Sequence, residues 1–290
     1  MILYRNIFNM KMGVLCILLL LVSCISLKSQ NSDIRKSEKS NGVKGDFEQE
    51  GSFIIAGICK DGILIASDKR FVIYDTTSVK PKPLAYFDGI QKIWIVDDYV
   101  LAMTGTGATQ NYFITHIIED FTVNKNSSIN FKNYIPQLLS FVRQNYPDEF
   151  IAFQRNIIRN KFFIAGYDQD IPKICAFSNY QTQCISGSGF IESDMTENMN
   201  DYDYSLTFDG LGDLMKNSIV VYSSTGDNWK KSGNTVDIVS ISNNQEPVWY
   251  QRSYSHNLPC ISDLKSDVKN GDLKIQMMKS YSLEELYKLF

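Results

Sequence analysis

Three polar residues stand beside strongly apolar runs, and they are the positions at which this sequence could perform chemistry. Ser52 follows Gly51 and precedes one run, Asp68 ends the next run, and Lys92 precedes a third. A serine hydroxyl is a weak nucleophile unless a neighbouring base accepts its proton. From the residues alone, Lys92 is more simply a surface lysine, and Asp68 is equally well a solvated strand end. Whether these residues are catalytic or ordinary surface residues depends on the strands and turns that position them.

The composition of the chain excludes several classes of function. Its 290 residues carry a formal net charge of −3, whereas nucleic-acid binding favours a basic surface. The chain has two histidines, His116 and His256, so a metal site with several histidine ligands is not expected. With 17 Phe and 16 Tyr, the chain can bury a large core. No metal or organic cofactor is implied, and we expect a folded domain that does not bind nucleic acid.

The first residues are typical of an export signal. Arg5 and Lys11 precede an apolar run over residues 12–22, which as a helix is about 16 Å long, roughly half of a bilayer core. That length and basic start predict a signal peptide over residues 1–23 and not a membrane span. The run ends at Cys24 in a Leu-Val-Ser-Cys sequence that resembles a bacterial lipobox. The sequence thus predicts an exported lipoprotein anchored in a bacterial envelope or, if Cys24 is incidental, a periplasmic or secreted protein.

Residues 24–50 are expected to be a disordered tether or a propeptide. Residues 28–50 hold five basic and five acidic side chains with three apolar ones, so this segment cannot bury enough surface to offset the entropy of ordering. The folded domain is expected to cover residues 51–255 and to be followed by a more polar tail over residues 256–290.

The cysteines of the domain are interpreted as buried thiols. Cys59, Cys175 and Cys184 lie in apolar runs, where a small thiol packs like other small apolar side chains. An exported protein could instead oxidise its cysteines in pairs, and the sequence does not choose between these states.

Alternation and helical periodicity predict an order of strands, two helices, strands, a helix and strands. The predicted strands lie at residues 53–58, 63–66, 93–96, 99–103, 162–165, 174–177, 236–241 and 248–250. The predicted helices lie at residues 109–121, 131–146 and 208–222, with a short one at 283–289. This order favours an α+β domain with two antiparallel sheets face to face and helices outside, a four-layer αββα sandwich. A mixed single-sheet α+β fold fits these elements nearly as well.

The opening of the predicted domain resembles that of 20S proteasome subunits and their bacterial relatives, which are N-terminal nucleophile hydrolases. In that family, a hydroxyl nucleophile becomes the mature N-terminus after a preceding glycine is cut away, and Gly51-Ser52 stands at that junction. Asp68 lies sixteen residues after Ser52, which is the family interval, and Arg70 completes the Asp-x-Arg motif. Lys92 fits the family's catalytic lysine, with eight extra residues separating it from Asp68.

A glycine turn after the second predicted hairpin extends the resemblance. Residues 104–107, Thr-Gly-Thr-Gly, resemble the family's turn that supplies oxyanion and substrate contacts. The resemblance therefore implies binding roles for Thr104 and Gly105. It covers residues 51–250 and implies the four-layer fold of N-terminal nucleophile hydrolases.

Two serines beside glycines resemble later elements of the family. Ser188, within Ser-Gly-Ser-Gly, occupies the serine of a Gly-Ser-Gly turn, and Ser232-Gly233 resembles a later Ser-Gly element. Both serines would orient the α-amine of the nucleophile. The acid that the family places three residues before Ser232 is replaced here by Trp229. Asp227 could substitute only if the loop were rearranged.

The resemblance implies hydrolysis of peptide or amide bonds without a histidine. Cleavage after Gly51 would free the α-amine of Ser52, with a reference pKa of about 8, to accept the Oγ proton. Lys92 would favour the developing alkoxide, and Asp68 would hold Lys92 in place. Backbone N–H groups near Gly105 would bind the tetrahedral oxyanion.

The main alternative is a non-catalytic subunit of the same fold that has a structural or binding role at a membrane. Proteasome α-type subunits share a Gly-Ser or Gly-Thr opening and a Lys-Ile pair, yet they are not cut there. The interval between Ser52 and Asp68 and the Ser188 turn favour the hydrolase. The family implies a homo-oligomeric ring in either case. A third hypothesis is an amidase that acts on a small molecule.

Overall fold

A computed structural model describes most of the chain after residue 51. The described residues are 52–75, 82–105, 107–109, 111–125, 133–159, 161–178, 181–187, 189–193, 205–230, 232–278, 281–282 and 284–286. The predicted site residues Cys24, Gly51 and Ser188 lie outside these ranges, as do the predicted signal peptide and tether and the side chain of Trp229. Within the described residues, no helix is long and apolar enough to cross a membrane.

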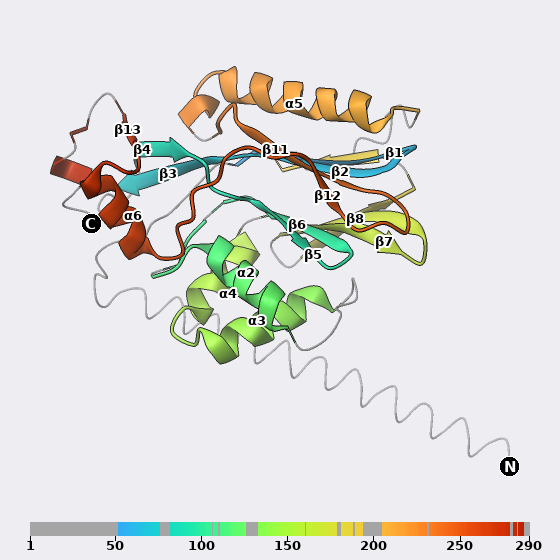
Figure 1. The fold of residues 1–290 in the computed structure, drawn as a ribbon, viewed down its shortest axis with the longest axis horizontal. Coiled ribbons are helices and arrows are strands. Elements are labelled where there is room, and N and C mark those ends of the chain that lie inside the picture. Colours follow the sequence, from blue (N-terminus) through green and yellow to red (C-terminus); the bar gives the residue numbers. More distant parts are fainter. Residues whose placement is uncertain are drawn as a thin grey trace, which may run out of the picture. The chain divides into compact units, whose positions relative to one another are not determined.

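The described part of the chain is α+β, as predicted, and its strands form three antiparallel sheets (Figure 1). The first sheet, in the order β10-β1-β2-β11-β12, contains β1 (Ile54–Cys59), β2 (Gly62–Asp68), β10 (Gly189–Glu192), β11 (Val236–Ile241) and β12 (Val248–Gln251). The second, β5-β6-β7-β8-β9, contains β5 (Ile93–Val96), β6 (Tyr99–Met103), β7 (Phe162–Asp168), β8 (Ile171–Ser178) and β9 (Gln181–Ser186). The third, β13-β4-β3, contains β3 (Arg70–Asp75), β4 (Lys82–Asp88) and β13 (Gln276–Met277).

Alternation along β2 divides its side chains between two cores. Ile63 and Ile65 belong to a buried cluster shared with the second sheet, whereas Leu64 and Ala66 belong to a cluster shared with a helix. That helix, α5 (Phe208–Ser224), begins after Thr207, whose hydroxyl accepts a hydrogen bond from the Gly210 N–H group. Successive strand residues face opposite sides of a sheet, so β2 is covered on both faces.

Three further helices cover the second sheet on its other face. They are α2 (Ile114–Asn124), α3 (Tyr134–Asn145) and α4 (Phe150–Arg159). In α3, Tyr134, Leu138 and Val142 recur every four residues and are buried against this sheet. Figure 1 shows α5 on one side of the two large sheets and α2, α3 and α4 on the other.

The segment after residue 255 differs from the polar tail that the sequence predicts. It forms α6 (Ile261–Asn270) and β13, and β13 pairs with β4. Ile261 and Leu264 of α6 are buried with Phe71 of β3 and Phe87 of β4 in a separate apolar cluster. The residues between Asp68 and Lys92 therefore include the β3–β4 hairpin, on which the C-terminal segment packs.

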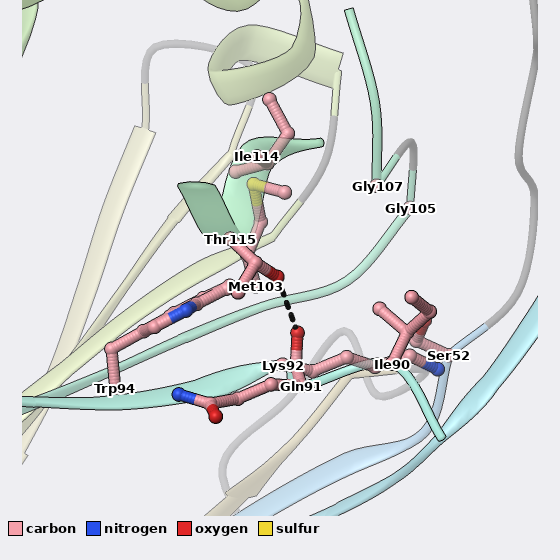
Figure 2. Close-up of a pocket in the computed structure, with 10 residues that line it drawn as sticks. All are labelled: Ser52, Ile90, Gln91, Lys92, Trp94, Met103, Gly105, Gly107, Ile114 and Thr115. Carbon is pink, nitrogen blue, oxygen red and sulfur yellow. Dashed lines mark hydrogen bonds between the residues drawn. The ribbon is translucent and has the colours of Figure 1, made fainter. Parts of the chain in front are cut away.

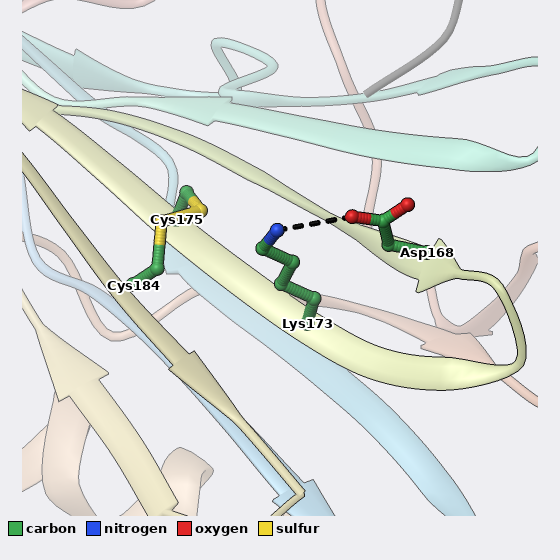
Figure 3. Close-up of a disulfide and its surroundings, with 4 residues drawn as sticks. All are labelled: Asp168, Lys173, Cys175 and Cys184. Atoms are coloured by element: carbon green, nitrogen blue, oxygen red, sulfur yellow. Dashed lines mark hydrogen bonds and ion pairs between the residues drawn. A yellow bond between two sulfur atoms is a disulfide. The ribbon is translucent and has the colours of Figure 1, made fainter. Parts of the chain in front are cut away.

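The prediction of buried thiols is wrong for two of the cysteines. Cys175 of β8 and Cys184 of β9 are directly opposite each other and form a disulfide (Figure 3). Opposite Cα atoms on neighbouring antiparallel strands lie about 4.5–5.5 Å apart, which is within the range that a disulfide spans. Cys59 and Cys260 are free thiols. The sequence missed the pair because β9 is too polar to be recognised as a strand.

Removing the disulfide should destabilise the second sheet. The bridge closes a loop with a sequence separation of 9 residues, and loss of the constraint on the unfolded chain is expected to cost about 2–3 kcal/mol for a loop of this size. Urea unfolding of Cys184→Ser against the parent protein measures this cost. Cys260→Ser, which removes a free thiol, is the matched control and should change the free energy of unfolding by less than about 1 kcal/mol. Equal effects of the two substitutions would contradict the disulfide.

Candidate active site

Asp68, at the end of β2, is the centre of the candidate site. Its carboxylate is fully buried and accepts backbone hydrogen bonds from Phe53 at 2.8 Å, Arg70 at 2.9 Å and Gly233 at 3.1 Å. Two of these donors directly follow Ser52 and Ser232 in the chain. The single carboxylate of Asp68 therefore brings together two segments that lie about 180 residues apart in sequence.

Lys92 completes a buried ion pair with Asp68. Its Nζ atom lies 3.1 Å from Oδ1 and 3.0 Å from Oδ2 of Asp68, and its side chain is 5% exposed. Burial lowers the pKa of the Lys92 ammonium group, and the Asp68 carboxylate opposes that shift. The Met103 N–H group donates to the Lys92 carbonyl at 3.1 Å, which fixes the lysine at the start of the β5–β6 hairpin.

Two buried serine hydroxyls at this site have no hydrogen-bond partner among the described residues. They belong to Ser52 and Ser232, which are 4% and 0% exposed. Most buried polar side-chain atoms in proteins are paired, and an orphan costs about 1–3 kcal/mol. The backbone around Ser52, by contrast, is fixed, because its carbonyl accepts a hydrogen bond from the Ser193 hydroxyl at 3.2 Å. An unpaired hydroxyl on a fixed backbone is available to another reactant.

Ser52 lines a small pocket (Figure 2). Lys92, Met103, Gly105 and Ile114 line it with Ser52, together with Ile90, Gln91, Trp94, Gly107 and Thr115. The lining is largely apolar. One hydrogen bond closes a wall of the pocket, from the Thr115 hydroxyl to the Gln91 carbonyl at 3.0 Å.

The turn that is predicted to bind substrate lies beside this pocket. Of its residues with predicted binding roles, Gly105 lines the pocket and Thr104 does not. Gly105 lines the pocket and has a φ of 83°, a backbone conformation that glycine adopts readily. The Thr104 hydroxyl is instead engaged with Lys161, donating to its carbonyl at 3.3 Å and accepting from its N–H group at 3.0 Å. Thr104 therefore supports the turn, and its side chain is not directed to a ligand.

Asp227 does not replace the acid that the family places near Ser232. Its carboxylate is 81% exposed and pairs with Lys230 at 2.8 Å. The 3-10 helix η1 (Asn228–Lys230) follows directly, and the Ser232 N–H group donates to the Asn228 carbonyl at 2.9 Å. The loop holds Ser232 at the site without bringing the Asp227 carboxylate to it.

Two supporting interactions escaped the sequence interpretation. Ser193 holds the backbone on both sides of the β1 start, since its hydroxyl also accepts from the Ile54 N–H group at 3.1 Å. Arg70 forms a two-pronged pair with Asp88, with both N–O distances 2.8 Å. A Cβ atom on Gly233 would lie 2.7 Å from the Asp88 carboxylate, so a larger residue there would displace this pair. No local sequence pattern predicts these contacts, because the residues that form them are far apart in the sequence.

Comparison with known proteins gives likeness only among solved structures. No family model matches the sequence, and no curated protein matches it. Among solved structures, the chain is similar to the Anbu Gly-1 mutant from Hyphomicrobium sp. strain MC1, with 12% sequence identity and a TM-score of 0.44. The likeness covers 77% of this chain and 96% of the Anbu chain.

Proposed function

We propose that this protein is an exported N-terminal nucleophile hydrolase that cleaves peptide or amide bonds, with Ser52 as its self-processed nucleophile. The two large sheets, packed face to face between α5 and the group α2–α4, support a four-layer αββα sandwich of that class. The observation that carries the proposal is the buried, unpartnered Ser52 hydroxyl, which shares a pocket with Lys92 of the buried Lys92–Asp68 pair.

Buried charges and unpartnered polar groups reduce stability. Their occurrence together at one place therefore supports a functional role for this site. An ion pair inside a protein seldom offsets the cost of removing both charges from water. Here that cost adds to the cost of two unpartnered hydroxyls at the same place. Clusters of such costly groups are typical of active sites, where they prepare charge for a reaction.

In the proposed processing reaction, Ser52 Oγ attacks the carbonyl carbon of Gly51. The Gly51–Ser52 C–N bond breaks as the Oγ–C bond forms, and the Oγ proton passes to the leaving nitrogen. Water then hydrolyses the resulting ester, which restores the hydroxyl and leaves Ser52 with a free α-amine. This amine is the base that the histidine-poor chain otherwise lacks.

In the proposed substrate reaction, the α-amine of Ser52 takes the Oγ proton while Oγ bonds to the substrate carbonyl carbon. The Lys92 ammonium group stabilises the developing negative charge on Oγ, and Asp68 keeps Lys92 in position. N–H groups near Gly105 would hold the oxyanion. The amine returns its proton to the leaving nitrogen, and water releases the acyl group. Ser188 and Ser232 would orient the α-amine.

Export, lipid anchoring and ring assembly are part of the proposal. The Cys175–Cys184 disulfide supports an oxidising compartment, because such bonds persist mainly outside the cytosol. Lipidation at Cys24 and cleavage after Gly51 would act in opposite directions, since cleavage frees the domain from the lipid. Residues 24–50 would then serve as a tether before processing and a propeptide after it.

The N-terminus of the mature protein tests the proposal. We expect mass spectrometry and N-terminal sequencing of protein purified from an exporting bacterial host to find a chain that begins at Ser52. A chain that begins at Cys24 and carries no activity would overturn the hydrolase and favour a non-catalytic, membrane-tethered subunit. A panel of fluorogenic peptides and small amides then separates a peptidase from an amidase.

A further inference from the structure

A second, larger pocket lies next to the Ser52 pocket and has a different chemical character. It measures about 220 Å³. His116 and Glu119 of α2 line one side, and Arg252, Ser255, His256 and Leu258 line the other. Both histidines of the chain are therefore in this one place. We name it the two-histidine pocket.

The wall that carries Arg252 and His256 is held rigidly by buried contacts. Lys69 and Asp237, both with fully buried side chains, pair at 2.8 Å, and Lys69 also donates to the Ser253 carbonyl at 3.1 Å and to the Ser255 hydroxyl. The Ser253 N–H group donates to Asp237 at 2.7 Å. A wall held in this way is preorganised. Binding is favoured because few side chains of this wall lose conformational freedom when a ligand binds.

The two charged groups of the pocket are opposite in sign and do not pair with each other. Among the described residues, neither the Arg252 nor the Glu119 side chain has an ion pair or a hydrogen bond, and both residues are exposed. The Arg252 guanidinium lies 4.8 Å from the centre of the Trp249 ring, which positions it over an aromatic face. Burial raises the pKa of Glu119, and His116 and Arg252 oppose that shift. The two charges are thus near enough to interact and remain free to bind.

The remaining lining suits a small side chain. Burial lowers the pKa of His256 below its ordinary value, which favours the neutral imidazole. The pocket therefore presents one fixed cation and one carboxylate, with apolar surface from Ile90, Leu258 and Pro259 between polar groups.

We propose that the two-histidine pocket binds a small molecule that carries both an ammonium group and a carboxylate, such as a free amino acid or a short peptide. The ligand carboxylate pairs with Arg252, its ammonium group pairs with Glu119, and its side chain contacts Leu258. A ligand with only one of the two charges leaves either Arg252 or Glu119 without a partner.

This site goes beyond the proposed hydrolysis, because Ser52 does not line it. The two pockets share Ile90, Gln91 and Thr115 in their linings. Amino acids and short peptides are also what peptide hydrolysis releases. Binding does not depend on that reaction, however, and Ser52→Ala should bind the ligand as the parent does.

The pair of histidines provides a direct assay. In tag-free full-length protein labelled with ¹³C at histidine Cε1, only His116 and His256 give signals. We expect L-leucine to shift both signals saturably at pH 7. N-acetyl-L-leucine, which lacks the ammonium group, and L-leucinamide, which lacks the carboxylate, should bind at least about tenfold more weakly, a difference of about 1.4 kcal/mol.

Three substitutions complete the test. Arg252→Gln and Glu119→Gln should each weaken L-leucine binding at least about tenfold. Arg143→Gln is the matched control, since Arg143 also lies over an aromatic ring, 4.5 Å from that of Phe150, and does not line the pocket. It should bind as the parent does. The proposal fails if L-leucine and L-leucyl-L-leucine shift neither signal, or if N-acetyl-L-leucine binds as tightly as L-leucine.

Discussion

Replacement of Ser52 by alanine should abolish both processing and hydrolysis while leaving the fold intact or slightly more stable. The nucleophile is lost, so we expect the rate to fall by about a thousandfold or more and the chain to remain uncut after Gly51. The hydroxyl that is removed is buried and has no partner, so its removal relieves a desolvation cost of up to about 1–3 kcal/mol. Intact mass, a fluorogenic peptide assay and urea unfolding measure the three effects.

Ser67→Ala is the matched control for this substitution. The Ser67 hydroxyl is also fully buried without a partner among the described residues, and Ser67 precedes Asp68 in β2, but it does not line the Ser52 pocket. Its removal should affect stability in the same direction and leave processing and activity unchanged. A Ser52→Ala protein that is still cut after Gly51, or is as active as the parent, would exclude Ser52 as the nucleophile.

The elements predicted correctly are those whose side chains alternate between two apolar environments. Both β1 and β2 are buried along their whole length, and they lie at the strands predicted for residues 53–58 and 63–66. Likewise, α5 shows its buried stripe at Leu211, Met215 and Ile219 at helical spacing. In these segments, local propensity and tertiary burial favour the same structure.

The missed elements depend on partners that are distant in the sequence. In β9, Ile185 is the one buried residue of six, so an apolar count does not reveal a strand that is paired to β8. In the same way, α6 buries only Ile261, Leu264 and Val268 of its ten residues, against β3 and β4. The structure of such edge elements depends on the strands against which they pack. Those contacts cannot be inferred from the local sequence.

At the candidate site, the sequence predicted residue types and spacing but not the supporting contacts. The interval between Ser52 and Asp68 is what the antiparallel β1–β2 hairpin requires, since Phe53 and Asp68 meet at its open end. The position of Lys92 could be predicted because this residue directly precedes the apolar strand β5. The hydrogen bonds of Ser193 and the pairing of Lys69 with Asp237 join residues more than a hundred positions apart, and no local pattern encodes them.

Breaking the Asp68–Lys92 pair should have a large effect on stability because both side chains are buried. Removal of one partner leaves an uncompensated buried charge, so we expect Lys92→Met and Asp68→Asn each to lower the free energy of unfolding by about 3–5 kcal/mol. In the double variant no charge is left unpaired, and its loss should be smaller than the sum of the single losses by about 0.5–3 kcal/mol. Urea unfolding of the four proteins gives this coupling.

A second ion pair of this chain separates the effect of burial from that of geometry. Lys173 and Asp168 also lie 3.0 Å apart, but their side chains are 25% and 33% exposed (Figure 3). Solvent screens an exposed pair, so Lys173→Met should cost only about 0–1 kcal/mol. The proposed function adds a second expectation. Lys92→Met should be inactive even at urea concentrations at which it is folded, whereas Lys173→Met should be active. Equal losses of stability from the two lysine substitutions would show that the Asp68–Lys92 pair is not buried as described.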